Sequence, residues 1–267
     1  MSKLIFANTV VAVCASLAIA TSAHAEDKSA QTFSLNTQSQ DFNQGFGTLT
    51  TASFEYKYKA KTSTFVLTPI VGQRDTAATK ETSIGAGLAV YHNWSSIIST
   101  RSEVFVAEDK SPFQHLDVAQ DVTGKIGTDT AITLGARWAR YAGGQDVWFV
   151  SGGVRQYFKG GSVAYRLSWT KPDTRNGYLS HLGSLTINDS KGKGKTQLWL
   201  SVGSASLATS QLPDSFRGKD LAGFLQRFQP INERMALLLS LGLSSYDRPV
   251  SRVTAKTFGL GLSIELN

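Results

Sequence analysis

The C-terminal stretch Thr257-Phe-Gly-Leu-Gly-Leu-Ser-Ile-Glu-Leu266 places an apolar residue at every second position. Side chains of a β-strand point alternately to its two faces, so this pattern predicts a strand with one apolar face. Met235–Leu243 repeats the pattern, and further rows of the same kind lie at 132–138, 163–169 and 198–202. The alternation therefore predicts an all-β chain.

Turn signals separate these rows along the chain. Gly143-Gly144, Gly160-Gly161 and Asn176-Gly177 are such signals, because glycine and asparagine accept the backbone angles of tight turns. Pro69 is expected to interrupt a strand, and Leu221–Phe228 also fits helical spacing. The predicted strands are 33–41, 46–58, 63–74, 82–94, 96–107, 112–124, 130–142, 147–159, 162–173, 178–189, 196–206, 220–229, 234–246 and 253–267.

Composition narrows the class of protein. The chain has 267 residues, a formal net charge of +7, a mean hydropathy of −0.12 and one cysteine. Outside the extreme N-terminus it has no run of about 20 apolar residues, which excludes a polytopic helical membrane protein. A single cysteine excludes a disulfide framework, and 41% hydrophobic residues argue against disorder.

The N-terminus has the features of a cleavable signal peptide. Lys3 precedes the apolar stretch Val10–Ala20, and Ala23-His24-Ala25 then forms a small-x-small cleavage site. Cleavage after Ala25 makes Glu26 the first mature residue, so residues 26–267 would form the barrel domain. A short membrane anchor and lipidation of Cys14 are the weaker alternatives.

The apolar faces favour a transmembrane barrel over a soluble sandwich, which remains the alternative. The segments have the length of about 9–11 residues that a tilted strand needs to cross a bilayer. Strand parity places Trp138, Trp148 and Trp169 near one rim and Trp94 near the other, as in an aromatic belt at the lipid interface. Trp199 breaks this pattern, because parity points it inward.

Parity also sorts the connections between strands. The short Asn93–Ser95, Lys159–Gly161 and Ile231–Glu233 would be periplasmic, and the longest connection, Leu207–Lys219, would be outside. An even number of strands closes the sheet and leaves no edge. We expect about fourteen antiparallel up-and-down strands, or twelve if two weak N-terminal segments do not span.

Three segments in the middle of the chain form a distinctive run: Gly135-Ala-Arg-Trp-Ala-Arg-Tyr141, Val147-Trp-Phe-Val-Ser-Gly-Gly153 and the return segment Gln156–Arg166. This run resembles the YaiO-like outer-membrane β-barrel family. The resemblance implies an exported barrel of a Gram-negative cell envelope with a role around surface polysaccharide. The family pattern contains no catalytic motif. The final residues Leu266-Asn267 depart from the aromatic end of many outer-membrane barrels.

Charged residues occupy the non-apolar faces of the central segments. Neighbouring strands would place opposite charges side by side in the lumen. A structural ion-pair network is the simpler interpretation, and a ladder that guides an anionic or sugar ligand is the alternative. These candidate lumen-lining binding residues are Arg101, Glu103, His115, Asp117, Asp121, Arg137, Arg155 and Arg166.

No catalytic residue, metal site or cofactor is predicted. Lipases of the outer membrane place His and Ser two residues apart on one strand face, and His92, His115 and His181 all lack such a serine. His115 and Asp117 are expected to share a face, which makes His115 the candidate base if the barrel were a lipid-modifying enzyme. The basic residues are dispersed, so lipopolysaccharide phosphates or plain solubility explain them better than a nucleic-acid partner does.

We therefore expect a non-enzymatic, porin-like barrel of the bacterial outer membrane, either a pore or a barrel associated with polysaccharide passage. A scaffold that recruits periplasmic proteins through its short turns is the second hypothesis, and a lipid-modifying enzyme is the third. The partners that follow are outer-membrane lipid and lipopolysaccharide, a glycan or small anionic solute, and periplasmic proteins.

Overall fold

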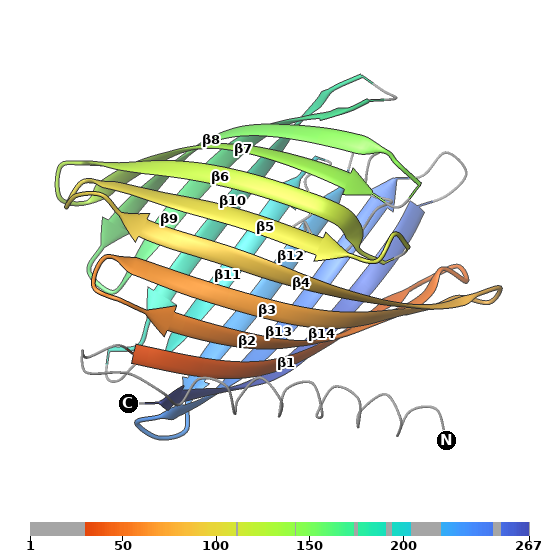
Figure 1. Ribbon diagram of the computed structural model, residues 1–267, viewed down its shortest axis with the longest axis horizontal. Helices are drawn as coiled ribbons and strands as arrows, with labels where there is room; N and C mark the ends of the chain where they lie inside the picture. Colours follow the sequence, from red (N-terminus) through yellow and green to blue (C-terminus); the bar gives the residue numbers. More distant parts are fainter. Residues whose placement is uncertain are drawn as a thin grey trace.

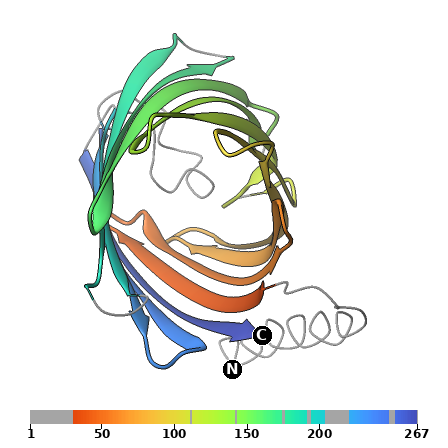
Figure 2. The ribbon, with the colours of Figure 1, turned by 90° about the vertical axis from the view of Figure 1, so that its left-hand side faces the viewer.

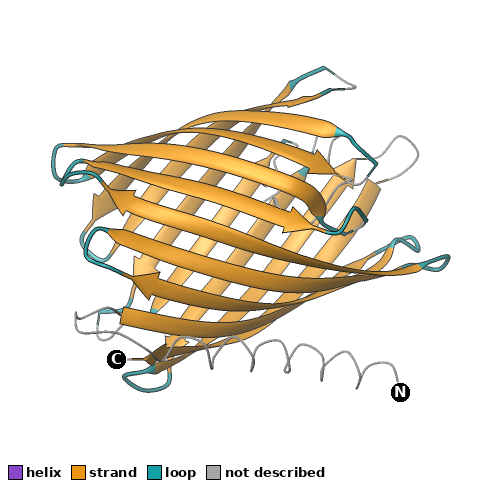
Figure 3. Cartoon of the chain, viewed as in Figure 1, coloured by secondary structure: helices purple, strands orange, loops and turns teal. Residues whose placement is uncertain are grey.

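Fourteen β-strands make up most of the described chain (Figure 3). The computed structural model describes residues 30–110, 112–141, 143–173, 176–190, 194–203, 220–247 and 252–266. Within these ranges no helix is long and apolar enough to cross a bilayer. The strands are β1 (Ala30–Phe42), β2 (Gly47–Lys59), β3 (Ser63–Asp75), β4 (Lys80–Asn93), β5 (Ile98–Ala107), β6 (Gln114–Ile126), β7 (Thr130–Tyr141), β8 (Asp146–Phe158), β9 (Gly161–Pro172), β10 (Tyr178–Asn188), β11 (Lys195–Val202), β12 (Leu221–Pro230), β13 (Met235–Asp247) and β14 (Arg252–Leu266).

The strands form one closed antiparallel barrel in which each strand pairs with its neighbours in sequence. The ring closes between the first and last strands, where Gln31 lies opposite Leu266 and Phe42 opposite Ala255. Figure 2 looks along the barrel and shows this ring of strands. Closure satisfies the edge hydrogen bonds of both terminal strands, which an open sheet would leave unpaired.

The two faces of the wall differ in chemistry. Large apolar side chains cover the outside, as in β13, where Leu239, Leu241 and Leu243 are 40%, 56% and 66% exposed. Ser240 lies between them on the inner face and is buried. The two-residue period produces this division, because it sends alternate residues of a strand to the outer side, where most of the large apolar ones lie.

The barrel has two different ends (Figure 1). β1 begins and β14 ends at one of them, which we call the termini end, and the hairpins β2–β3, β4–β5 and β6–β7 turn there. The opposite, distal end carries the connections after β1, β3, β5 and β7. The turn Lys159-Gly160 is the shortest connection at the termini end. Gly160 has φ +92°, a conformation that glycine adopts without strain.

Three apolar clusters pack inside the distal end. The first joins Phe42, Leu49, Tyr246, Val253 and Ala255, with Phe46 against it. The second joins Ala139, Tyr141 and Val147, and the third joins Phe105, Ala107 and Phe113. The first and third clusters combine strand ends with a residue of the adjoining connection, whereas the second consists of strand ends alone. Packed apolar side chains therefore line the interior at the distal end.

The strand assignment from sequence agrees closely with this fold. All fourteen predicted segments are strands, and their described ends lie within four residues of the expected bounds. Leu221–Phe228 is part of β12, so the helical alternative is wrong. The barrel has fourteen strands and not twelve. Residues 1–25, Cys14 and the connection Leu207–Lys219 lie outside the described residues.

Pro69 does not break its strand, contrary to expectation. β3 runs without interruption from Ser63 to Asp75, and Pro69 pairs in register with Ala86 of β4. On the other side the β2–β3 register passes from Ser53↔Ile70 to Tyr56↔Leu67, without a pairing at Pro69. Proline lacks an N–H group, so only one of its two ladders is affected.

Candidate functional site

Charged side chains gather on the inner faces of β5, β6, β7 and β9. In β6, Asp117 and Asp121 alternate with Val118 and Val122, which are 44% and 47% exposed on the outside. The strand register then places Arg101 of β5 opposite Asp121. The alternation of single residues thus delivers acids and bases from different strands to one region of the lumen.

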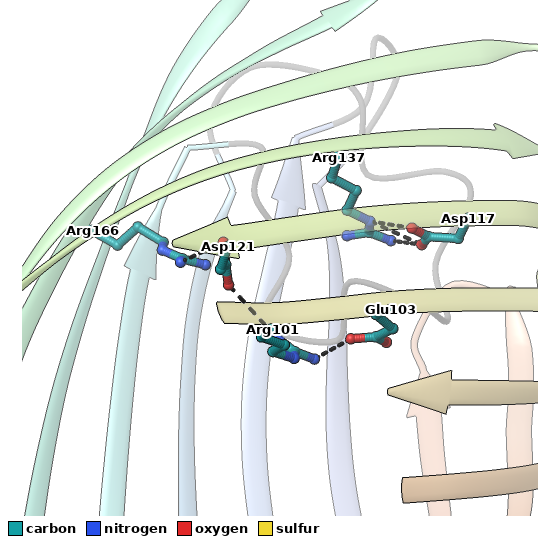
Figure 4. A network of polar contacts seen from close by, with 6 residues as sticks. All are labelled: Arg101, Glu103, Asp117, Asp121, Arg137 and Arg166. Carbon is teal, nitrogen blue, oxygen red and sulfur yellow. Dashed lines mark hydrogen bonds and ion pairs between the residues drawn. The ribbon is translucent and has the colours of Figure 1, made fainter. Parts of the chain in front are cut away.

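The ion pairs of this region connect residues of β5, β6, β7 and β9 (Figure 4). Arg137 Nε donates to Asp117 Oδ1 and Oδ2 at 2.9 Å each. Arg166 Nη2 donates to Asp121 Oδ1 at 3.0 Å, and Arg101 Nη1 lies 3.9 Å from Asp121 Oδ2. Arg101 Nη2 also contacts Glu103 Oε2. We call these six residues the ion-pair network: Arg101, Glu103, Asp117, Asp121, Arg137 and Arg166.

The network is balanced in charge, because its three arginines face three carboxylates. Its most buried pair is Asp117 with Arg137, whose side chains are 10% and 17% exposed. A buried pair of this kind is stable only when both partners are present. Its geometry matches the structural interpretation of the charged rows well.

A glycine makes room for the network. A Cβ atom on Gly135 of β7 would lie 2.0 Å from Asp121 Oδ1 and 3.0 Å from Ser151 Oγ. Any side chain there would displace the carboxylate that accepts from Arg166. The small residue in the middle of β7 therefore determines where the Asp121 carboxylate lies.

Two of the eight candidate residues lie outside the network. Arg155 of β8 donates from Nη1 to Ser162 Oγ at 2.9 Å and has no carboxylate partner among the described residues. His115 lies where the β6–β7 register shifts between Gln114 and Leu116, and its Nδ1 is 2.8 Å from the Ala107 carbonyl oxygen.

The irregularity at His115 corrects one expectation. Sequence parity placed His115 and Asp117 on one face as a base and its orienting acid. In the structure the shift at Gln114 breaks that parity, and Asp117 is bound to Arg137. The two residues therefore do not form an acid–base pair.

The wall opposite the network is uncharged. In a ring of fourteen strands β14 lies across from β7. Apart from Glu265 near the end of β14, the inner faces of β12, β13, β14 and β1 carry no charged side chain. We call the polar and glycine residues of these four inner faces the small-polar wall: Gln226, Ser240, Thr257, Gly259, Gly261, Asn36, Gln38 and Gln40. Phe224, Phe228 and Leu238 also lie on the inner face of β12 and β13.

The tryptophans divide as parity indicated. Trp148 and Trp169 are 55% and 44% exposed on the outer face toward the distal end, and Trp138 lies beside Trp148 with 6.3 Å between ring centroids. Trp94 is 68% exposed at the termini end. Contact of these rings with a lipid interface stays a prediction. Trp199 lies on the inner face, with its ring centroid 5.7 Å from that of Phe224.

Sequence reasoning missed two groups on the outer face at the termini end. Phe33 packs against Phe54 and Tyr56, so aromatic residues other than tryptophan gather there. Ser63 Oγ lies 2.8 Å from His92 Nδ1 across the β3–β4 ladder. A search for Ser and His on one strand could not find this pair. The register of the β3–β4 hairpin, which places Ser63 opposite His92, was the signal that could have revealed it.

Metal-ligating groups do not cluster in the part of the chain that is described: no three His, Cys, Asp or Glu residues come together. The functional candidates are therefore the lumen and the outer Ser63–His92 pair.

The family profile of the YaiO membrane β-barrel domain matches residues 30–208 of this chain. The match spans more than half of the sequence, and the chain belongs to this family. It is thus a membrane β-barrel, a fold that belongs to the outer membrane.

Solved outer-membrane barrels share the fold at very low sequence identity. A monoaromatic hydrocarbon channel, CymD, superposes with a TM-score of 0.60 and 6% identity, covering 91% of this chain and 90% of that one. A bacterial polysaccharide outer-membrane secretin gives 0.54 and 6%, covering 91% and 100%. The Pseudomonas putida toluene transporter TodX gives 0.55 and 8%, covering 90% of each chain. At these identities the likeness concerns the fold alone.

Proposed function

We propose that this member of the YaiO family is a non-enzymatic channel of the outer membrane that passes small polar solutes. The observation that carries the proposal is the polar middle of the barrel. The ion-pair network on one side faces the small-polar wall on the other. Side chains of this kind are stable beside water, whereas the packed apolar clusters are confined to the distal end.

The number of strands agrees with this function. Eight strands enclose an interior that side chains fill, and sixteen or more leave an aqueous channel. Fourteen strands with serine, threonine and glycine on one wall leave more space than the smaller barrels do. The apolar clusters at the distal end would then form the narrowest part of the path.

Conductance of the refolded protein tests the proposal. In planar bilayers we expect discrete current steps, and in liposomes we expect swelling rates that fall as the added sugar becomes larger. Truncation of the distal cluster by Phe113→Ala should raise the conductance. Phe258→Ala on the outer face is the matched control and should leave it unchanged. Absence of current at every salt and polarity, with intact heat-modifiable folding, would overturn the channel.

We further propose that the solutes belong to surface-polysaccharide metabolism. The resemblance to YaiO-like barrels supports this idea, and so does the inner Trp199–Phe224 pair, since planar rings stack on sugar faces. We expect oligosaccharides to slow the passage of small ions in wild-type protein and less so in Trp199→Ala. Equal block of both proteins would contradict a sugar-stacking role for Trp199.

A lipid-modifying enzyme is the second candidate, and one observation favours it. Ser63 and His92 form a hydrogen-bonded pair on the outer face, where a membrane lipid could reach them. Neither residue has a carboxylate within hydrogen-bond distance among the described residues, so the pair lacks the acid that orients a catalytic histidine. Overexpression of wild type and Ser63→Ala should give identical lipid profiles. A lipid change that only wild type produces would favour the enzyme.

Export and partners complete the proposal. We propose that residues 1–25 are removed and that the mature chain begins at Glu26, which intact mass of the membrane-extracted protein would test. We also propose lipopolysaccharide as the outer neighbour and periplasmic proteins as partners of the termini end. Crosslinking in intact envelopes followed by mass spectrometry identifies both, and recovery of neither would remove this part.

A further inference from the structure

An arginine of the lumen has no acidic partner among the described residues. Arg155 lies on the inner face of β8, since Val154 on the neighbouring position is 44% exposed on the outside. Its described polar contact is one hydrogen bond from Nη1 to Ser162 Oγ. One N–H group of five is thereby accounted for, and the remaining donors of the guanidinium are available to another acceptor.

A second cation lies in the same row across the strands. The register joins Lys125 of β6 to Ala131 of β7, and Ala131 to Arg155 of β8. Adjacent strands are spaced by about 4.8 Å, so the backbones at Lys125 and Arg155 are roughly 10 Å apart. Both side chains are long enough to reach a small ligand between them. Lys125 has no ion pair within the described part of the chain.

The residue between the two cations is small. Ala131 is 4% exposed and offers only a methyl group, so it cannot occupy the space over which the two side chains meet. Asp121 and Asp129 are each four residues from Lys125 along the chain, and among the described residues neither forms an ion pair with Lys125 or Arg155. The row therefore presents two positive charges above a small apolar floor.

The contrast with Arg166 shows that this excess is local. Arg166 of β9 is in register with Gly153, two residues before Arg155. Its charge is neutralised by Asp121 at 3.0 Å. Arg155 and Lys125 thus lie beside a balanced network but outside it. A positive pair in this position attracts anions that enter from the termini end.

We propose that Arg155 and Lys125 form an oxyanion-binding site in the lumen, which takes phosphate or carboxylate groups of the solutes that the channel passes. The proposal rests on the channel function proposed above. The guanidinium presents a planar fork that binds two oxygens at once, and the ammonium adds a point charge from the other side. Ser162 holds the guanidinium in place through its hydroxyl.

Equilibrium dialysis of the full-length refolded barrel in zwitterionic detergent tests the site directly. The probes are radiolabelled inorganic phosphate and glucuronate, with glucose as the neutral comparison. We expect one saturable site for at least one oxyanion and none for glucose. Loss of one charge-assisted contact in Arg155→Gln or Lys125→Gln should weaken binding by roughly tenfold or more. Binding of only one of the two oxyanions would identify which group the site prefers.

A matched control removes the same charge from another place. Lys256→Gln lies on the outer face of β14, beside the 56% exposed Phe258, and should bind as wild type does. Equal weakening by Lys256→Gln would show that net charge and not the site governs binding. Unchanged binding in Arg155→Gln, with the folded heat-modifiable form intact, would overturn the proposal.

Bilayer recordings separate this site from the channel function. In a salt gradient we expect a reversal potential on the anion-selective side for wild type, shifted toward cation selectivity in the double variant Arg155→Gln, Lys125→Gln. Absent current with intact phosphate binding would remove the channel and keep the site. Current whose selectivity and phosphate binding do not respond to the double substitution would keep the channel and remove the site.

Discussion

The two sides of the lumen line the inside of the barrel with different kinds of side chain. On β5, β6, β7 and β9 the six side chains of the ion-pair network line the interior and neutralise one another. On the small-polar wall, serine, threonine, glutamine and glycine present the backbone and short hydroxyl groups instead. The first arrangement depends on specific partners, whereas the second depends on small volume. Substitutions should therefore be far more damaging on the first wall.

The largest effect is expected from the most buried pair. Asp117 is 7% exposed, and Arg137→Met removes its partner. The substitution therefore leaves a buried carboxylate without its cation. We expect the free energy of unfolding to fall by about 3–5 kcal/mol. Urea titration of the refolded barrel, followed by tryptophan fluorescence, measures it.

The double variant Arg137→Met, Asp117→Leu is the matched control for this pair. It removes both charges and should recover most of the lost stability, because an apolar pair of similar volume replaces the ion pair. A loss below about 1 kcal/mol for Arg137→Met alone would show that the pair behaves like an exposed one and would break the comparison.

An intermediate effect is expected at the glycine under the network. Gly135→Ala places a Cβ atom 2.0 Å from Asp121 Oδ1, so the carboxylate must move away from Arg166. A loss of about 1–3 kcal/mol should follow in the same titration. Gly152→Ala on the outer face of β8, where the nearest atom is Leu134 Cδ2 at 3.7 Å, should be nearly neutral. Equal losses would point to backbone flexibility and not to the network.

A smaller effect is expected on the small-polar wall. Ser240→Ala removes a buried hydroxyl that accepts a long 3.5 Å hydrogen bond from Gln226 Nε2. The free energy of unfolding should change by less than about 1 kcal/mol. A loss above about 2 kcal/mol would mean that this wall also depends on specific partners.

The smallest effect belongs to a charge pair outside the lumen. Asp189 follows β10, and Arg227 Nη1 donates to its Oδ1 at 2.7 Å. This hydrogen bond lowers the pKa of Asp189 below its ordinary value. The pair therefore stabilises the fold above the ordinary carboxyl pKa, and the contribution is lost as the pH falls through the lowered pKa. Asp189→Asn should lower Tm slightly at pH 7.

The pH series makes this last prediction specific. The difference in Tm between wild type and Asp189→Asn should shrink from about pH 4 downward and then vanish. A difference that stays constant to the lowest pH would assign it to the shape of the side chain and not to its charge.

Most of the fold could be predicted from the alternation of apolar and polar residues along the chain. Met235–Leu243 and Thr257–Leu266 could be predicted as strands, because apolar residues recur there at every second position and successive residues of a strand face opposite sides. The predicted strand break at Pro69 was wrong, because the missing N–H affects only the ladder with β2 and leaves the ladder with β4 intact. The first distal cluster was not predictable, since it joins the ends of β1, β2, β13 and β14, which meet only when the barrel closes.

The site was predictable in composition but not in pairing. The charged rows of β5, β6, β7 and β9 follow from parity, yet only the register shows that Arg101 and Arg166 share Asp121. A register shift at Gln114 moved His115 out of the expected acid–base pair. The Ser63–His92 contact needed knowledge of neighbouring strands, which sequence spacing within one strand does not contain.

The ladder between β1 and β14 must be the last one to form during assembly. Its contacts join positions more than two hundred residues apart, such as Ser34 with Ser263, whose hydroxyls are 3.0 Å from each other. The other ladders connect consecutive strands and can zip one hairpin at a time, but this one must wait until the last strand has been delivered. Until then the two edge strands of the growing sheet expose unpaired N–H and C=O groups. The first and last strands are therefore the edges that can pair with other chains before the ring closes.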